Sequence, residues 1–363
     1  MIVNIEFLDE EPIENMITSL HYKIDKVVFF GYSEIIKEQK ESTQKFLKKY
    51  CGVKQVVFHP VSRTNLDSVL QTMRKEIAFE KGNGGELFVD ITGGEDLVLA
   101  AFGMLAQEMK IPIHMYDIAK DRLIEMEMGN RNSISNRALA HSIELDLNAY
   151  IEMQGGIINY RMHKGVKNSG GKEFEETMEI LWNIFYRHSS TWYLFSDFIK
   201  RYDGKQGKLP SSIEPILNDC SKEGILQNVK YEKGKVSFEY KNQDVRELLW
   251  DTGSVLEMYT FLQECKKATD CKVGVHLDWD GILHAKRGED VLNEIDVLSI
   301  RGNIPTFISC KSGNVDQMVL YELETVAERF GGKYARKILV VSKRLSNTHR
   351  LRAEEMGIEV RQL

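Results

Sequence analysis

The sequence predicts an α/β protein with a Rossmann-like N-terminal domain, a winged-helix-like connector and a compact C-terminal α/β domain. Three observations support this. Short apolar runs alternate with helical patterns up to residue 118, three helices and a hairpin follow, and the end of the chain combines helices with strands. At 363 residues the chain also exceeds one ordinary core. We expect domains at residues 1–150, 151–247 and 248–363.

The N-terminal pattern is a regular alternation of strands and helices. Strands are expected at 1–8, 26–32, 53–60, 86–94 and 111–118, and helices at 12–22, up to Tyr50, at 65–80 and at 95–110. Strands connected by helices in this way form a parallel sheet that is covered on both faces.

The middle of the chain predicts a winged-helix module. Residues 119–170 are weakly patterned, and the polar run HKGVKNSGGKE (163–173) is typical of a hinge. Helices are expected next at 174–187, 191–202 and 211–225, with a hairpin at 226–242.

The last part combines helices and strands in a compact order. We expect a helix at 248–265, strands at 272–281, 294–300 and 306–312, a helix at 317–330 and a closing strand at 337–343.

Composition excludes several classes of protein. Hydrophobic residues make up 42% and charged residues 28%, and no apolar stretch is long enough to cross a bilayer. The N-terminus lacks the pattern of a cleavable leader, so we expect a cytoplasmic protein without a membrane partner. Five scattered cysteines indicate neither a disulfide framework nor a zinc cage. A net charge of −6 means that nucleic acid would need a local basic patch or a metal.

One motif indicates phosphate binding. Asp90-Ile91-Thr92-Gly93-Gly94 ends a predicted strand and opens a helix, so its glycines allow close approach and free amides at the helix start could face an anion. Loops after the other parallel strands fall on the same edge, where ligands of open α/β sheets bind. The alternative is that the motif is only a tight strand-to-helix turn.

With these residues, the region 1–118 resembles the CRISPR-associated Rossmann-fold family. That resemblance implies a homodimer that binds a cyclic oligoadenylate, here cyclic tetra-adenylate, in a groove across its two-fold axis. Threonine and lysine often follow the glycines in that family, whereas Glu95 and Asp96 follow here. The effector-binding residues implied are Leu8, Asp9, Gly31, Tyr32, Ser33, Arg63, Thr64, Asn65, Thr92, Gly93 and Gly94.

A second constellation lies in NEIDVLSIRGNIPTFISCKSG (293–313). Residues two apart on a strand share a face, so Glu294 and Asp296 project together, as do Ser309 and Lys311 from the next strand. Carboxylates beside a lysine suit metal-assisted phosphodiester hydrolysis, because oxygen ligands hold a hard cation and the ammonium stabilises developing negative charge. The alternative is a structural ion pair between Asp296 and Lys311.

This pattern resembles the PD-(D/E)xK nuclease superfamily over about residues 250–345. The resemblance implies Asp296 as the metal-binding aspartate and Lys311 as the lysine, with a further carboxylate from Glu257 and a QxxxY spacing from Gln317 to Tyr321.

One position departs from the pattern. Ser309 stands where the superfamily usually has Glu or Asp, so either Glu257, Glu294 or Asp278 supplies the missing carboxylate or the metal site is weak. The Cys310 carbonyl would add another oxygen, and the implied cofactor is Mn²⁺ or Mg²⁺.

The order of the modules is similar to that of cyclic-oligoadenylate-activated nucleases of type III CRISPR defence. It implies a nuclease that cuts DNA, with RNA as a second candidate substrate. Two alternatives stay open at this point. One is a ligand-responsive transcription regulator that reads DNA with residues 171–245 and has an inactive nuclease domain. The other is a ring nuclease that degrades its own effector.

Overall fold

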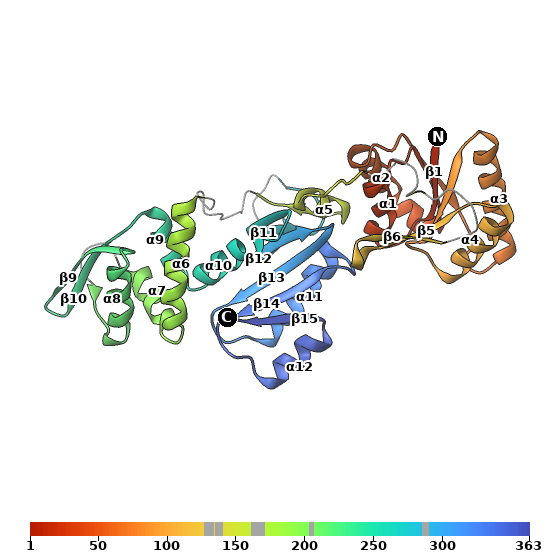
Figure 1. The fold of residues 1–363 in the computed structure, drawn as a ribbon. Helices are drawn as coiled ribbons and strands as arrows, with labels where there is room; N and C mark the ends of the chain where they lie inside the picture. The colour runs from red at the N-terminus through yellow and green to blue at the C-terminus, as the bar shows by residue number, and fades with distance from the viewer. Residues whose placement is uncertain (127–133, 135–140, 161–170, 203–206, 285–289) are drawn as a thin grey trace. The chain divides into compact units, whose positions relative to one another are not determined.

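The structure, a computed structural model, describes residues 1–126, 134, 141–160, 171–202, 207–284 and 290–363 (Figure 1). Most of the predicted hinge, residues 163–170, lies outside the described residues. The chain forms two compact units. The first comprises Met1–Gly155 with Gly302–Ile304 and Gly332–Tyr334, and the second comprises Gly156–Arg301, Pro305–Gly331 and Ala335–Leu363.

The first unit is built on a six-stranded sheet in the order β3-β2-β1-β4-β5-β6. The first five strands pair in parallel and the last pairs antiparallel with β5. The sequence did not predict β6. The strands are β1 (Ile2–Phe7), β2 (Lys26–Gly31), β3 (Gln55–Pro60), β4 (Glu86–Asp90), β5 (Ile113–Asp117) and β6 (Arg122–Met126).

Helices cover both faces of this sheet, as predicted, with α1 and α2 on one side and α3 and α4 on the other (Figure 1). The central strands β1, β2 and β4 are buried along almost their whole length because both faces are covered, whereas β3 and β6 at the two edges are partly exposed. The helices are η1 (Pro12–Asn15), α1 (Ile17–His21), α2 (Ser33–Tyr50), α3 (Leu66–Gly82), α4 (Asp96–Met109), η2 (Ile118–Lys120) and α5 (Leu147–Met153).

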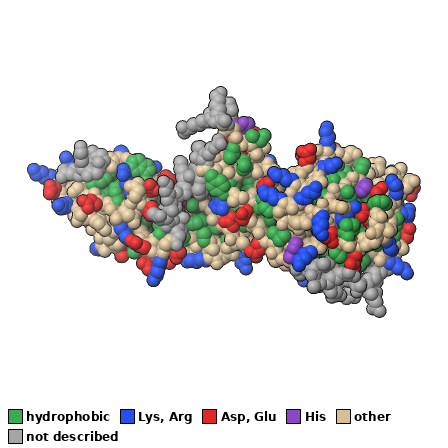
Figure 2. All heavy atoms as spheres, turned by 90° about the horizontal axis from the view of Figure 1, so that it is seen from above, with side chains coloured by type: hydrophobic (Ala, Val, Ile, Leu, Met, Phe, Trp, Pro, Cys, Tyr) green, Lys and Arg blue, Asp and Glu red, His purple; other side chains and the backbone are tan. Residues whose placement is uncertain are grey.

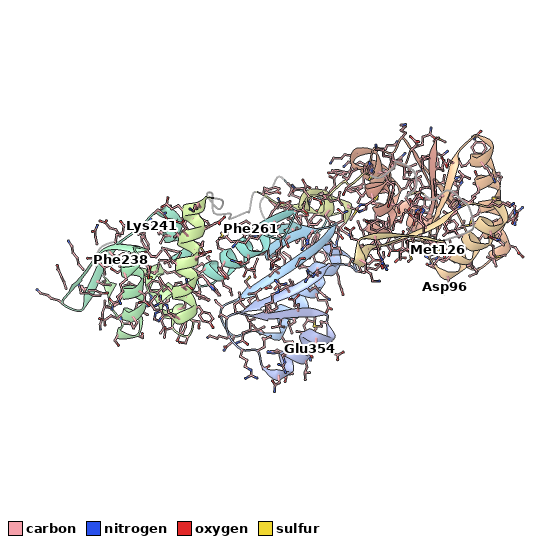
Figure 3. All side chains as sticks on the ribbon, in the orientation of Figure 1. Asp96, Met126, Phe238, Lys241, Phe261 and Glu354 are labelled. Carbon is pink, nitrogen blue, oxygen red and sulfur yellow. The ribbon has the colours of Figure 1, made fainter. Side chains whose placement is uncertain are left out.

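The second unit begins with the predicted three helices and hairpin. Lys233 and Gly234 both have positive φ angles and form the two-residue turn between β9 and β10, which suits the twist of a hairpin. Phe238 on β10 stacks on Tyr202 at a centroid distance of 4.1 Å (Figure 3). The elements are α6 (Lys172–Arg187), α7 (Trp192–Arg201), β8 (Gly207–Lys208), η3 (Ser211–Ile213), α8 (Glu214–Lys222), β9 (Leu226–Glu232) and β10 (Lys235–Tyr240).

A second six-stranded sheet, in the order β15-β14-β13-β12-β11-β7, forms the rest of this unit. Its core is continuous with that of the helical module; Trp182 of α6 stacks on Tyr259 of α10 at 4.1 Å. The strands are β7 (Ile157–Ile158), β11 (Asp270–Asp278), β12 (Leu292–Arg301), β13 (Ile304–Lys311), β14 (Arg336–Val341) and β15 (Ile358–Gln362). The helices are α9 (Gln243–Trp250), α10 (Ser254–Cys265), α11 (Gln317–Gly331) and α12 (Asn347–Glu355).

The single helix expected at 248–265 is wrong, because α9 ends at Trp250 and α10 begins at Ser254. Asp251 is extended, with a ψ of 140°. A Cβ on Gly253 would lie 2.5 Å from Glu257 Oε1, so the break brings the chain close to that carboxylate. The sequence also missed α12 and the edge strands β7 and β15, which are short.

No helix within the described ranges is long and apolar enough to cross a membrane. The face in Figure 2 carries interspersed acidic and basic side chains and no continuous basic surface. This agrees with the net charge of −6.

Candidate functional site

Four loops meet at the carboxyl edge of the N-terminal sheet. Since β3, β2, β1 and β4 are parallel neighbours, the loops that follow them lie side by side. The structure therefore gathers the predicted effector residues there: Leu8 and Asp9 after β1, Gly31–Ser33 after β2, Arg63–Asn65 after β3 and Thr92–Gly94 after β4.

Below this edge lies a buried carboxylate that sequence reasoning missed. The Asp90 carboxylate is fully buried and accepts hydrogen bonds from Thr18 Oγ1, Asn4 Nδ2 and the Thr92 amide and hydroxyl, and its Oδ2 lies 3.1 Å from His114 Nε2. Burial alone would raise the pKa of Asp90, but His114 and the hydroxyl donors outweigh burial and lower it to about 2. Asp90 is therefore an ionised anchor for the start of the DITGG loop. A histidine inside an apolar strand, IPIHMYDI, was the available signal.

The glycine loop is fixed by acidic side chains. The Gly94 amide donates to Asp9 Oδ2 at 3.0 Å, and the Thr92 amide donates to Asp90 Oδ1 at 2.8 Å. The expectation of free amides is thus wrong for these two positions. A Cβ on Gly93 would lie 2.9 Å from Glu14 Oε2, and Gly94 has a φ of 135°, so both positions require glycine. The Thr92 hydroxyl also accepts from the Tyr116 amide.

Glu95 has a partner at this edge. Arg63 Nε donates to Glu34 at 2.8 Å, and its Nη1 donates to Glu95 at 3.2 Å. The guanidinium lies 3.9 Å from the centre of the Tyr32 ring, and the Tyr32 hydroxyl donates to Glu95. Burial, followed by the Glu95 carboxylate, raises the pKa of Tyr32 to about 12. Arg63 is thus held by two carboxylates and an aromatic face. Asp96 opens α4 beside them (Figure 3).

Several of the predicted effector residues have structural roles here. Leu8 is completely buried, backbone included, so in this structure it presents no surface to a ligand. Asn65 caps α3 by accepting from the Ser68 amide at 3.0 Å. A Cβ on Gly31 would lie 3.0 Å from Leu8 Cβ, so the two loops touch. The Thr64 amide donates to the Ser62 hydroxyl, and Ser33 begins α2.

In the second unit, the predicted catalytic residues converge on Asp296. Its Oδ2 accepts from Ser309 Oγ at 3.1 Å, from the Cys310 amide at 2.6 Å and from Lys311 Nζ at 3.3 Å. Asp296 and Lys311 therefore face the same side of the sheet from β12 and β13. Burial lowers the pKa of Lys311, but the Asp296 carboxylate more than offsets this and raises it above its usual value. Lys311 remains a cation.

Glu257 of α10 completes the cluster. It is half-buried, and its pKa rises to about 8, first because of burial and second because of the Asp296 carboxylate; Lys311 opposes the shift. Two carboxylates close enough to perturb each other favour a cation between them. The Asp296 Oδ1 atom accepts no hydrogen bond from any described residue, so it is available to such a cation.

The other two proposed carboxylates lie farther away. Glu294 is half exposed and pairs with His276, whose Nε2 lies 3.6 Å from Glu294 Oε2. Asp278 pairs across the sheet with Leu292, four residues along β12 from Asp296. Four residues of strand span roughly 13 Å, which places Asp278 out of reach. Of the three candidates, Glu257 has the clearest electrostatic link to Asp296.

The donors suit a hard divalent cation only when the backbone contributes. Within the described ranges, no group of three or more His, Cys, Asp or Glu side chains could hold a metal ion. Asp296 and Glu257 supply two carboxylates. The Cys310 amide points at Asp296, and in an extended strand the carbonyl of the same residue faces the same neighbour. Asp296, Glu257 and the Cys310 carbonyl thus form an oxygen-only set.

The predicted QxxxY pair lies on one face of α11. Gln317 Nε2 donates to the Tyr321 hydroxyl at 3.0 Å, and this hydroxyl also accepts from Arg352 at 2.6 Å. The pair therefore connects α11 to α12.

Comparisons with known proteins agree with this fold. Residues 244–362 match the family model of the Card1-like endonuclease domain. The comparison with curated proteins gives no match. Among solved structures, protein VC1899 from Vibrio cholerae is similar, with a TM-score of 0.74, 16% identity and coverage of 99% of this chain and 93% of that one.

Two further structures share the fold. Can2 from Sulfobacillus thermosulfidooxidans, solved with cyclic tetra-adenylate, has a TM-score of 0.70 at 15% identity and covers 99% of this chain and 93% of its own. A type III CRISPR defence DNA nuclease activated by cyclic oligoadenylate has a TM-score of 0.50 at 14% identity and covers 94% of this chain and 45% of its own. The predicted fold class is confirmed, and the C-terminal region is an endonuclease domain.

Proposed function

We propose that this nuclease is a homodimer that requires a divalent metal, cuts DNA and also accepts RNA, and is activated in the cytoplasm by cyclic tetra-adenylate bound at the N-terminal sheet edge. One observation supports the catalytic half most strongly. Ser309 Oγ, the Cys310 amide and Lys311 Nζ all lie within 3.3 Å of Asp296 Oδ2. Glu257 is close enough for the Asp296 carboxylate to raise its pKa.

The residues divide the work of phosphodiester hydrolysis. Asp296 Oδ1, Glu257 and the Cys310 carbonyl would hold Mn²⁺ or Mg²⁺, which supplies Lewis acidity and an activated water when bound. Lys311 stabilises the negative charge that develops on the phosphate as water adds to phosphorus and the leaving oxygen departs. Ser309 and the Cys310 amide orient Asp296 by donating to its other oxygen.

The regulatory half rests on the N-terminal edge. Arg63, which lies over the buried Tyr32 ring, offers a cation, and the DITGG loop offers a closely approachable backbone; both suit the phosphates of a cyclic oligonucleotide. Activation requires that the ligand bind the active arrangement of the dimer more tightly than the inactive one.

The test measures nicking of a supercoiled plasmid and cleavage of a labelled RNA with Mn²⁺ or Mg²⁺, with and without cyclic tetra-adenylate. We expect cleavage only with both metal and effector, and light scattering should give the mass of a dimer. Cleavage that ignores the effector would remove the regulatory half. Activity that survives Asp296→Ala would remove the catalytic half.

A second candidate is a ligand-responsive DNA-binding regulator with an inactive nuclease domain. Ser309 favours it, because a buried hydroxyl stands where a charged ligand is usual. Salt-sensitive, sequence-specific duplex binding without strand breaks would support this candidate over the nuclease.

A further inference from the structure

A pocket of about 320 Å³ lies in the second unit, between the helical module and the endonuclease sheet. One wall is Trp192 and Tyr193 at the start of α7. The others are Thr252 before α10, the segment 312–314 after β13 and Lys343 after β14. Ligand pockets start at about 300 Å³, so this one suits a small unit such as a single nucleotide.

Two walls continue directly into the proposed catalytic cluster. Lys311 immediately precedes the 312–314 segment. Thr252 precedes Gly253, at which an added Cβ would lie 2.5 Å from Glu257 Oε1. The loop is fixed, since Ser342 Oγ donates to the Ser312 carbonyl at 2.9 Å. A strand cleaved at the cluster would therefore pass this pocket.

The lining has the chemistry that a nucleotide needs. Tyr193 is 54% exposed, although it lies beside the buried Trp192, and offers a face for base stacking. Lys343 is half-buried and has no carboxylate partner among the described residues, so an anion would satisfy it.

We infer that this pocket is a subsite for one unstacked nucleotide of the nucleic-acid substrate, next to the phosphodiester that is cut. The base stacks on Tyr193, and the adjoining phosphate pairs with Lys343. The inference rests on the proposed nuclease function and adds that the connector itself binds substrate, through α7.

The test combines protein variants with substrates that each lack one base. The effector-activated full chain with Mn²⁺ is assayed on 12-nucleotide single strands, each with one abasic residue at a successive position. In the wild type, a missing base (here called a gap) at one fixed position relative to the cut should lower kcat/KM about tenfold. Tyr193→Ala should lower kcat/KM on the intact strand about equally and abolish the gap penalty, and Tyr193→Phe should restore both. Lys343→Gln should raise KM more than it lowers kcat.

The matched control is Tyr186→Ala, because Tyr186 is 61% exposed on α6 and does not line the pocket. It should behave as wild type. A gap penalty that persists in Tyr193→Ala, while the wild type cleaves normally, would overturn the subsite and leave the nuclease function intact.

If the wild type cleaves nothing, the nuclease function fails, and fluorescence anisotropy of the same oligonucleotides decides about the subsite. Loss of the gap-dependent affinity in Tyr193→Ala then supports it, and equal affinities overturn it. Saturable binding of free AMP that is tighter than binding of the strand would also overturn it, because the pocket would then be a mononucleotide site.

Discussion

Each unit of the chain contains a carboxylate that is buried or half-buried against its sheet, and folding shifts the pKa values of the two groups in opposite directions. Asp90 in the N-terminal sheet has a pKa of about 2, because His114 and several hydrogen-bond donors outweigh its burial. Glu257 beside the C-terminal sheet has a pKa of about 8, because burial and the Asp296 carboxylate act together and only Lys311 opposes them.

The opposite pKa shifts distinguish Asp90, which anchors a loop, from Glu257, which is part of the proposed metal site. Asp90 is saturated with donors and holds the Thr92 backbone in place, so it needs nothing further. When both are ionised, Glu257 and Asp296 carry more negative charge than Lys311 neutralises, so a bound cation would favour the ionised form of Glu257. A buried carboxylate indicates a metal site only when its partners leave it unsatisfied.

The largest expected effect is a loss of nuclease activity when Asp296 is replaced. Asp296→Asn should lower nuclease activity by at least about 100-fold, because loss of a ligand should exceed the 10- to 100-fold cost of losing an outer-shell partner. Plasmid cleavage rates with Mn²⁺ measure this. The control is Asp280→Asn, since Asp280 is half exposed and pairs with His284 instead. Equal losses in both variants would contradict the assigned role of Asp296.

Replacement of Asp90, whose oxygens already accept several hydrogen bonds, should lower the free energy of unfolding. Asp90→Asn should destabilise the protein by about 3 kcal/mol at pH 7, because it removes one partner of a buried pair. The pKa of Asp90 falls from 3.8 to about 2 on folding, so its contribution is complete above pH 3.8 and is lost as the pH falls toward 2. Thermal melts at pH 7 and pH 3 should show the gap between wild type and variant closing; a gap independent of pH would refute the assignment.

Glu257 should show the opposite pH dependence. Folding raises its pKa from 4.5 to about 8, so without metal the wild type loses stability as the pH rises through this window. Glu257→Gln should therefore gain in Tm relative to wild type between pH 5 and pH 8, by roughly 3 °C for each kcal/mol of stability that the wild type loses. Mn²⁺ should cancel the gain by stabilising the wild type alone. A Tm difference that does not change with pH would contradict a raised pKa.

Ser309 should matter less than Asp296. Ser309→Ala removes one hydrogen bond to a charged group, a kind worth about 1.5–3 kcal/mol; at 3.1 Å this bond is long, so we expect the low end of that range and a fall in activity of about tenfold. Kinetics with saturating Mn²⁺ measure this fall. A loss as large as that of Asp296→Asn would make the Ser309 hydroxyl a direct participant in the reaction.

The smallest effect is expected at the N-terminal edge. Glu95→Gln releases Arg63 from one of two carboxylates, and an exposed pair is worth up to about 1 kcal/mol, so affinity for cyclic tetra-adenylate should rise about two- to fivefold. Isothermal titration calorimetry measures the change. The control Asp67→Asn makes the same charge change at another exposed position in the first turn of α3. Weaker binding in Glu95→Gln would mean that Glu95 itself contacts the ligand.

Local pattern predicted most of the fold. The alternation of apolar runs and helices specified the N-terminal sheet, and the two-residue spacing placed Asp296 and Lys311 on one face. Short edge strands such as β6 and β15 were missed because five residues carry little periodic signal. The break before α10 had a local signal that the pattern analysis overlooked, because Gly253 caps α10 and its carbonyl accepts from the Glu257 amide one turn later.

The partners of the charged groups were also beyond the sequence. Thr18 and His114 reach Asp90 from elements far apart in the chain, and Arg63 meets Glu95 only because β3 and β4 lie in one sheet. Residue spacing gives the face on which a carboxylate lies. It does not show whether donors from other elements saturate that carboxylate.

The most direct measurement is the anomalous diffraction of manganese in crystals soaked with Mn²⁺. We predict one peak within about 2.5 Å of oxygen atoms from both Asp296 and Glu257, with the Cys310 carbonyl as a third ligand. A protein that binds Mn²⁺ elsewhere, or leaves these two carboxylates without an ion at saturating Mn²⁺, would contradict the metal-dependent nuclease.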